Sequence, residues 1–214
     1  ISLHQYRTHY PKNSELFTGV KRDVKLLRHC TDIKDSTFTV FDISLLSNAD
    51  YIKPILDNGN YVKWFDHHVP GETDLGNNFS IKVNADPNCC TNILVDEYLN
   101  GLYRPWTICG IYGDNLHEQA DKFNPCFNKE SMNKLKEVGE TLNYNGYGNE
   151  ELDLTVHPKD VYLDLKDYES PFEYRKKSET YHKIYTQMKS DEAELSSSEI
   201  LHESESGKVI LLPN

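Results

Sequence analysis

The stretch YVKWFDHHVPGE, residues 61–72, shows a predicted strand that ends in a group of polar side chains. Its apolar run stops at Asp66, and His67 and His68 follow directly. A short apolar run bounded by turn residues is typical of a buried strand, and we expect one at 60–65. One carboxylate and two imidazoles in a row either belong to a solvated loop or hold a ligand.

Strand-like and helix-like runs alternate up to about residue 120. Strands are expected at 15–20, 36–43, 60–65 and 79–84, and helices at 22–30, 47–59 and 90–102. The run at 104–115 fits either state. This alternation predicts an α/β fold with a mainly parallel sheet flanked by helices.

The second half of the chain is predicted to be mainly helical. Helical patterns lie at 129–148, 157–168 and 171–188, and their many tyrosines are expected to pack rather than to bind a ligand. The acidic, Ser-rich stretch at 190–206 is typical of a solvated helix or connector. The expected organisation is an α/β domain at 1–125, a helical annex and acidic connector at 126–206, and the start of a second domain at 207–214.

Charge and hydropathy restrict the partners. The 34 acidic and 23 basic residues give a net charge of −11, so a long duplex nucleic acid would be repelled unless basic residues gathered on one face. No window approaches about 18 uncharged apolar residues, so no membrane span is expected. The first residues, ISLHQYRTHY, have neither the basic start nor the apolar core of a signal peptide.

The five cysteines are odd in number and fit no zinc-finger or zinc-ribbon spacing. We therefore expect buried, reduced thiols and a cytoplasmic location. The chain begins with Ile1 rather than Met, and its last stretch, GKVILLPN at 207–214, has the pattern of a strand. Both features lead us to expect a longer protein that is cut inside an element at each end.

Three acidic residues follow apolar runs. Asp42 ends TFTVF, Asp66 ends NYVKWF, and Asp114 ends WTICGIYG. Each of them alone is also a common turn or cap residue. If all three lay at the carboxyl ends of parallel strands, they would converge on one crevice together with His67 and His68. Carboxylates and imidazoles without thiolates suit Mn²⁺, Mg²⁺ or Fe²⁺, and paired ions of this kind serve phosphoryl transfer.

These residues resemble the motifs of the DHH phosphoesterase superfamily. WFDHHVPGE resembles the signature tripeptide, FTVFDIS the second motif, and GIYGDN the fourth, in the same order and over roughly residues 1–120. The superfamily includes single-strand exonucleases, oligoribonucleases, nucleoside bisphosphate phosphatases and inorganic pyrophosphatases. The resemblance therefore implies a metal-dependent hydrolase that acts on a small phosphoester or a short oligonucleotide through a two-metal-activated water.

The resemblance also implies a role for each matching residue. Asp42 would bridge two divalent ions, with Mn²⁺ foremost, and His67 and Asp114 would each bind one of them. His68 would face the substrate phosphate as a catalytic and substrate-binding residue. Asp66, the second catalytic residue, would orient an imidazole from behind.

Three further expectations concern residues near these motifs. Lys21 and Arg22, in TGVKRD, are the basic candidates for phosphate binding, although solvated residues that open a helix are an equal alternative. His4 could replace a missing ligand, but we expect it on the surface of a helix over ISLHQYR. We also expect that the protein can form a homodimer.

The chain departs from the family at its first motif, Asp-x-Asp-Gly, which supplies ligands to both ions and is absent. Most of the C-terminal substrate-binding domain is absent as well. The alternative to an enzyme is therefore a catalytically silent nucleotide-binding or scaffold module.

Overall fold

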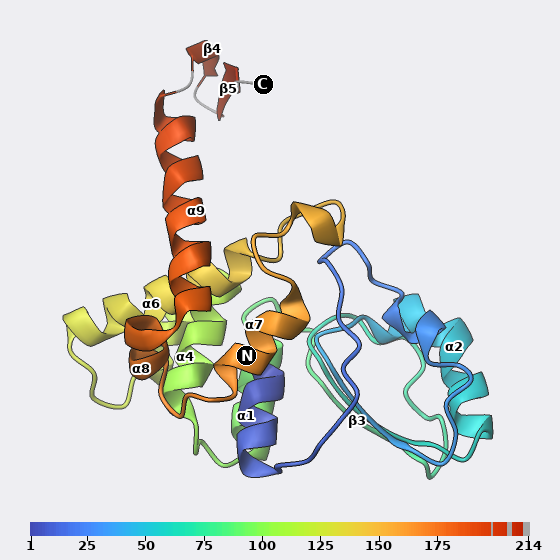
Figure 1. The fold of residues 1–214 in the computed structure, drawn as a ribbon. Helices are drawn as coiled ribbons and strands as arrows, with labels where there is room; N and C mark the ends of the chain where they lie inside the picture. The colour runs from blue at the N-terminus through green and yellow to red at the C-terminus, as the bar shows by residue number, and fades with distance from the viewer. Residues whose placement is uncertain (198, 205–206, 212–214) are drawn as a thin grey trace.

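The first part of the chain folds around a parallel sheet of three strands (Figure 1). The computed structural model describes residues 1–197, 199–204 and 207–211. Strands β1 (Thr37–Phe41), β2 (Tyr61–Asp66) and β3 (Phe79–Val83) pair in the order β1-β2-β3, with Val40 opposite Trp64 and Trp64 opposite Ile81. The predicted α/β class and these three predicted strands are confirmed.

One face of the sheet packs against helix α2 (Leu45–Asp57), which connects β1 to β2. Side chains alternate along a strand, so Val40 and Trp64 point to this face, where they meet the buried Ile52 and Ile55. The helix begins after Ser44, whose hydroxyl accepts a hydrogen bond from the backbone of Ser47. This short crossover makes β1 and β2 parallel and brings their carboxyl ends to one edge.

Helices α1 (Ser2–His9) and α3 (Thr91–Tyr98) cover the other face. Phe41 and Phe65 stack at a ring distance of 5.3 Å, and Tyr6 packs edge-on against Phe41. Leu99 and Val95 complete this smaller core. In Figure 1, α1 lies between the sheet and α4.

The helices after β3 form a second, larger core. They are α4 (Arg104–Gly113), α5 (His117–Phe123), α6 (Lys129–Tyr144), α7 (Pro158–Leu165), α8 (Pro171–Lys177) and α9 (Glu179–Ser197), with the short turn η2 (Glu151–Asp153) between α6 and α7. The 3₁₀ turn η1 (Leu26–His29) lies before the sheet and packs in the first core with α2. Trp106, Leu135, Tyr174 and Tyr181 are buried together there, so these tyrosines do pack as expected. The expected boundary at 125/126 falls inside this continuous core.

The last described elements are β4 (Glu199–Ser204) and β5 (Gly207–Leu211), which form an antiparallel pair beyond the far end of α9 (Figure 1). The stretch 190–206, expected to be helix or connector, thus contains a strand. The predicted strand in 207–214 is confirmed over Gly207–Leu211, and residues 212–214 lie outside the described part of the chain.

Some predicted elements were wrong. Residues 15–20 form no strand, since the chain crosses there from α1 to η1 as a loop. The helix expected at 22–30 is only the 3₁₀ turn η1, and the pattern at 171–188 is interrupted at Ser178, whose hydroxyl caps α9 by accepting from Tyr181. The ambiguous run at 104–115 is helical. No helix in the described residues is long and apolar enough to cross a membrane.

A buried polar network joins α1, α3 and α4. Asn92 donates to Gln5, Gln5 donates to the Thr107 hydroxyl at 2.7 Å, and Thr107 donates to Asp96 at 2.7 Å. Arg104 pairs with the other oxygen of Asp96 at 3.1 Å. The side chains of Gln5, Asn92, Asp96 and Thr107 are nearly inaccessible to water, so each depends on the others for its hydrogen bonds.

Thr107→Val should destabilise the protein by about 2–3 kcal/mol, because the shape is kept while Gln5 and Asp96 lose a buried partner. The expected result is a melting temperature lower by about 5–10 °C. Thr8→Val is the matched control, since the exposed Thr8 hydroxyl bonds only the carbonyl of His4. Equal melting temperatures for the two variants would contradict a stabilising role for the network.

Candidate metal centre

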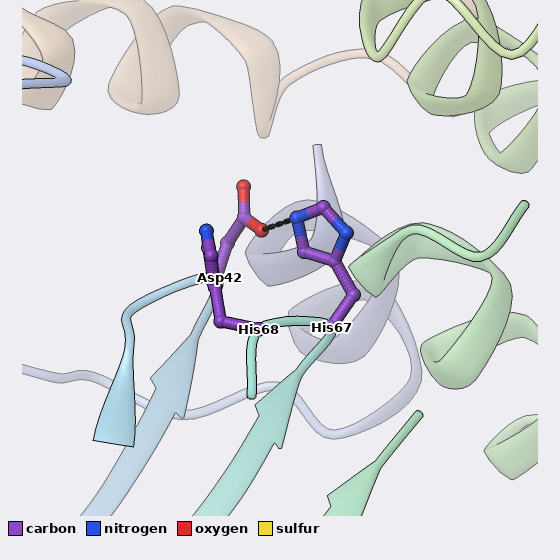
Figure 2. Close-up of side chains that lie close together, drawn as sticks. All are labelled: Asp42, His67 and His68. Carbon is purple, nitrogen blue, oxygen red and sulfur yellow. Dashed lines mark ion pairs between the residues drawn. The ribbon is translucent and has the colours of Figure 1, made fainter. Parts of the chain in front are cut away.

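The carboxyl ends of β1 and β2 bring Asp42, His67 and His68 together (Figure 2). One potential ligand atom of each lies within 4.8 Å of those of the other two. The Nε2 atom of His67 is 3.3 Å from Oδ1 of Asp42, and the two histidine rings are 4.6 Å apart. The parallel register places Phe41 of β1 opposite Phe65 of β2, so the two strands end at the same level of the sheet. The residues that follow them, Asp42 and His67, therefore lie close together.

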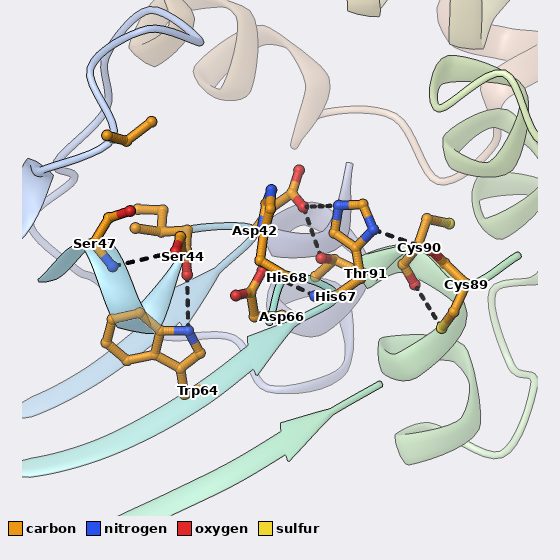
Figure 3. A network of polar contacts seen from close by, with 12 residues as sticks. Asp42, Ser44, Ser47, Trp64, Asp66, His67, His68, Cys89, Cys90 and Thr91 are labelled. Atoms are coloured by element: carbon orange, nitrogen blue, oxygen red, sulfur yellow. Dashed lines mark hydrogen bonds and ion pairs between the residues drawn. The ribbon is translucent and has the colours of Figure 1, made fainter. Parts of the chain in front are cut away.

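The ring of His67 is held by a backbone carbonyl. Its Nδ1 atom lies 3.0 Å from the carbonyl oxygen of Cys89, and a carbonyl can only accept, so Nδ1 carries the proton (Figure 3). In the neutral ring the lone pair is then on Nε2, which faces Asp42. An imidazole whose second nitrogen is fixed in this way has the usual arrangement of a metal-binding histidine.

Asp66 orients His68. The carboxylate is fully buried, and its Oδ1 atom lies 2.6 Å from Nδ1 of His68 and accepts the backbone N–H of His67 at 2.9 Å. Asp66 therefore acts from behind the cluster, as expected, but on the ring of His68 and the backbone of His67 rather than on the ring of His67. Its Oδ2 atom is buried without a hydrogen-bond partner in the described structure.

The charges at this edge favour a cation between Asp42 and His67. A carboxylate oxygen and a neutral Nε2 are both acceptors, so at 3.3 Å they repel unless a proton or a metal ion lies between them. The hydrogen bond with Asp42 raises the pKa of His67 to about 9, against the opposing effect of burial. Desolvation at the sheet edge acts to raise the pKa of the half-exposed Asp42, but hydrogen bonds from His67 and Thr91 lower it. The donor set fits a hard divalent ion.

Mn²⁺ should stabilise the protein more at about pH 8.5 than at about pH 6.5. Without metal, protonated His67 stabilises the fold fully below its unfolded pKa of 6.5, and this contribution is lost as the pH rises through about 9. A metal ion needs the neutral ring, so its effect on melting temperature grows over the same window. Melting curves with and without Mn²⁺ at both pH values measure this. The dependence should vanish in His67→Asn and persist in His29→Asn, which changes an exposed histidine of η1.

The backbone at Asp42 is in a rare conformation. Its φ angle is +59°, in the left-handed region that aspartate and asparagine tolerate better than other non-glycine residues. Its N–H still donates to the carbonyl of Phe65, and its carboxylate accepts from the Thr91 hydroxyl at 2.7 Å. Asn115, directly after Asp114, has the same φ of +59°. Residues in such conformations are found at functional sites, and Asp42 is one of the three residues of the cluster.

Asp114 lies near the cluster but outside it. It follows helix α4 rather than a strand, so the strand-end expectation was wrong for this residue, because the Gly-rich run GIYG is helical. Burial and the proximity of Asp42 raise the pKa of Asp114, and His67 acts on it in the opposite direction. Asp114 lines the same cavity as Asp42 and His67, while the tight group of ligand atoms is Asp42, His67 and His68.

The two basic candidates behave differently. Lys21 lines the same cavity as Asp42, and its ammonium group donates to Asn143 at 2.6 Å and to the Tyr147 hydroxyl at 3.3 Å. Arg22 is exposed and lines only a small neighbouring hollow. Lys21 therefore shares a cavity with Asp42, whereas Arg22 lines the neighbouring hollow.

His4 is buried, and the expected surface position was wrong. It is 2% exposed and packs edge-on against Trp106 at 4.6 Å. Burial lowers its pKa to about 4, so the ring is neutral at physiological pH. His4 does not line the cavity that contains Asp42, and it serves the helical core instead.

Two contacts at the site involve residues that sequence reasoning missed. Thr91 orients the carboxylate of Asp42, and the carbonyl of Cys89 orients His67. A backbone carbonyl has no signal in the sequence, and a threonine at the start of a helix resembles any other. The five cysteines are free thiols, and four of them are buried as expected while Cys126 is exposed.

No protein-family model, curated protein or solved structure matches this chain significantly.

Proposed function

We propose that this protein is a metal-dependent phosphoesterase that hydrolyses a small phosphoester or a short oligonucleotide. The observation that carries the proposal is the convergence of one carboxylate and two imidazoles, with His67 Nε2 facing Asp42 while its Nδ1 is fixed by Cys89. The Asp42 carboxylate and the neutral His67 ring place two acceptors 3.3 Å apart, a pair that a cation stabilises, at the sheet edge where α/β proteins bind ligands.

Asp42 and His67 would hold a divalent ion, and Asp114 would contribute to a second one. Mn²⁺ is the first expectation, with Mg²⁺ and Fe²⁺ as alternatives. Such ions, when bound, make water a stronger nucleophile and offset the charge of the phosphoryl oxygens. The protein itself fixes the ligands in place through Thr91 and the carbonyl of Cys89.

His68 would interact with the substrate phosphate. Its Nδ1 proton is directed at Asp66, which leaves Nε2 for the substrate. The hydrogen bond with Asp66 raises the pKa of His68, so a larger fraction of the ring is protonated near neutral pH. A protonated Nε2 can donate a hydrogen bond to a phosphoryl oxygen or a proton to the leaving group. Lys21, which lines the same cavity, would add a second positive charge.

A silent nucleotide-binding or scaffold module is the second candidate. The tight group offers three ligand atoms, Asp114 lies outside it, and a two-ion site needs more ligands than three. In that case the protein binds a phosphorylated ligand without hydrolysing it. The free, mostly buried thiols support a reducing, cytoplasmic location for either candidate.

The decisive experiment is an assay with Mn²⁺, and with a chelator as control, on three substrates. A short single-stranded oligonucleotide, a nucleoside bisphosphate and inorganic pyrophosphate cover the expected classes. Hydrolysis of any of them that depends on Mn²⁺ supports the enzyme. Calorimetric binding of an oligonucleotide without turnover on any substrate would favour the silent module instead.

A further inference from the structure

The cavity beside Asp42 continues along the gap between α1 and β1. It has a volume of about 1560 Å³, and residues at both ends of α1, Ile1 and Tyr10, line it. Asp42, His67 and His68 line it where β1 and β2 end. Lys63 also lines it and lies opposite Thr39, three residues before Asp42, so at about 3.3 Å per strand residue it is roughly 10 Å from that end. The cavity is therefore longer than a single phosphate group needs.

The end away from Asp42 is lined by aromatic rings and a lysine. Tyr10 and Tyr98 are 41% and 38% exposed, and their ring centres are 6.4 Å apart. Tyr6 stacks on Tyr98 from the buried side at 6.2 Å. The Lys63 ammonium group donates to the Tyr98 hydroxyl at 3.0 Å and lies 5.1 Å from the centre of that ring. These rings are thus supported from below and open toward the cavity.

This end is basic although the protein as a whole is acidic. Arg7, Lys12 and Lys63 all line the cavity in a chain with a net charge of −11, and they outnumber the one acidic residue of this stretch that lines it, Glu15. Lys63 bonds tyrosine hydroxyls, and Arg7 donates to the Ser14 hydroxyl at 2.6 Å, so both cations have neutral partners here. Exposed aromatic rings beside such cations are the usual arrangement for binding single-stranded nucleic acid.

We propose that Tyr10, Tyr98 and Lys63 form a nucleobase-binding subsite for the nucleotide that adjoins the phosphate held at Asp42. A base stacks on the open tyrosine rings, and the basic side chains face the backbone of the same strand. The ligand class is a short single-stranded oligonucleotide, since inorganic pyrophosphate would leave the subsite empty. This inference rests on the proposed function only for the position of the phosphate at Asp42.

The test compares a trinucleotide with an abasic trinucleotide backbone of the same charge. Binding is measured by calorimetry with a chelator present, which stops metal-dependent hydrolysis. Stacking contributes about 1–3 kcal/mol per base, so the trinucleotide should bind about fivefold tighter or more. Tyr98→Leu should remove most of this difference, and Tyr98→Phe should keep it because the ring remains. Tyr10→Ala should reduce it, and a melting curve checks that each variant is folded.

Lys189→Ala is the matched control for Lys63→Ala. Lys189 also lies over a tyrosine ring, Tyr185 at 5.5 Å, but on α9 and outside the cavity. Lys63→Ala should weaken binding of both trinucleotides, and Lys189→Ala should not. Equal affinity of the unchanged protein for the two trinucleotides would overturn the subsite. If base-dependent binding is lost in Tyr98→Leu while Mn²⁺ supports no hydrolysis, the subsite stands and only the proposed enzyme fails.

Discussion

Asp42→Asn is expected to reduce Mn²⁺-dependent hydrolysis by a thousandfold or more, on the order of the several kcal/mol that metal-assisted charge stabilisation supplies. Asparagine has nearly the same shape, and it tolerates the left-handed backbone at φ +59°. The substitution therefore removes the negative charge of Asp42, which faces His67 and would bind the ion, and it adds no backbone strain.

The same variant should bind Mn²⁺ about a hundredfold less tightly or worse, because even loss of an outer hydrogen-bond partner of a metal ligand has effects of about 10–100-fold. Isothermal titration with Mn²⁺ measures this independently of activity. Asp42→Ala should be equally inactive, but it adds the strain of alanine at a positive φ and is the less clean variant.

Asp35→Asn is the matched control for this prediction. Asp35 is an exposed aspartate with a positive φ of +48°, and it precedes β1 at the opposite end from Asp42. The same chemical change there should leave both hydrolysis and Mn²⁺ affinity unaltered. Turnover by Asp42→Asn equal to that of the unchanged protein would exclude Asp42 from the site.

Gly139→Ala should destabilise the fold by about 3 kcal/mol or more, at the upper end of what overpacking usually costs. Helices α4 and α6 approach each other closely at this residue. A Cβ atom on Gly139 would lie 2.0 Å from the carbonyl oxygen of Cys109 and 3.0 Å from the backbone nitrogen of Gly113. Both neighbours are backbone atoms of α4, so the helices themselves would have to move apart.

The expected measurement is a melting temperature lower by roughly 6–12 °C, or loss of soluble protein. Gly19→Ala is the control, because the atom nearest its new Cβ, at 2.9 Å, is the end of the flexible Leu26 side chain. Gly19→Ala should change the melting temperature little. Equal stability of the two variants would show that α4 and α6 can separate at low cost, contrary to the packing of Leu135 and Val138 in the core.

Most of the sheet could be predicted from local patterns. The runs at 36–43, 60–65 and 79–84 are rich in β-branched and aromatic residues and end at turn formers, and each forms a strand. The run at 15–20 has a similar composition but fails, because β1, β2 and β3 pair with one another and leave it in a loop. Local propensity does not reveal which strands find a partner.

Within the candidate site, the sequence by itself determined that Asp42, His67 and His68 follow apolar strands. Parallel pairing then brings the ends of these strands together. Only the tertiary structure decided that Asp114 ends a helix and stays outside the tight group, and that His4 is buried against Trp106. The physical reason is that burial and helix direction depend on contacts between segments far apart in the chain.

The sequence contains Lys63, Tyr10 and Tyr98 in three separate segments, and no pattern in it indicates that they lie together. The tertiary structure brings them to one end of the cavity, because α1 lies along the sheet and α3 covers the same face. The tautomer of His67 is decided in the same way, by a carbonyl at Cys89 whose position depends on the path of the chain between β3 and α3. Residue type determines what chemistry is available, and packing determines which groups share one site.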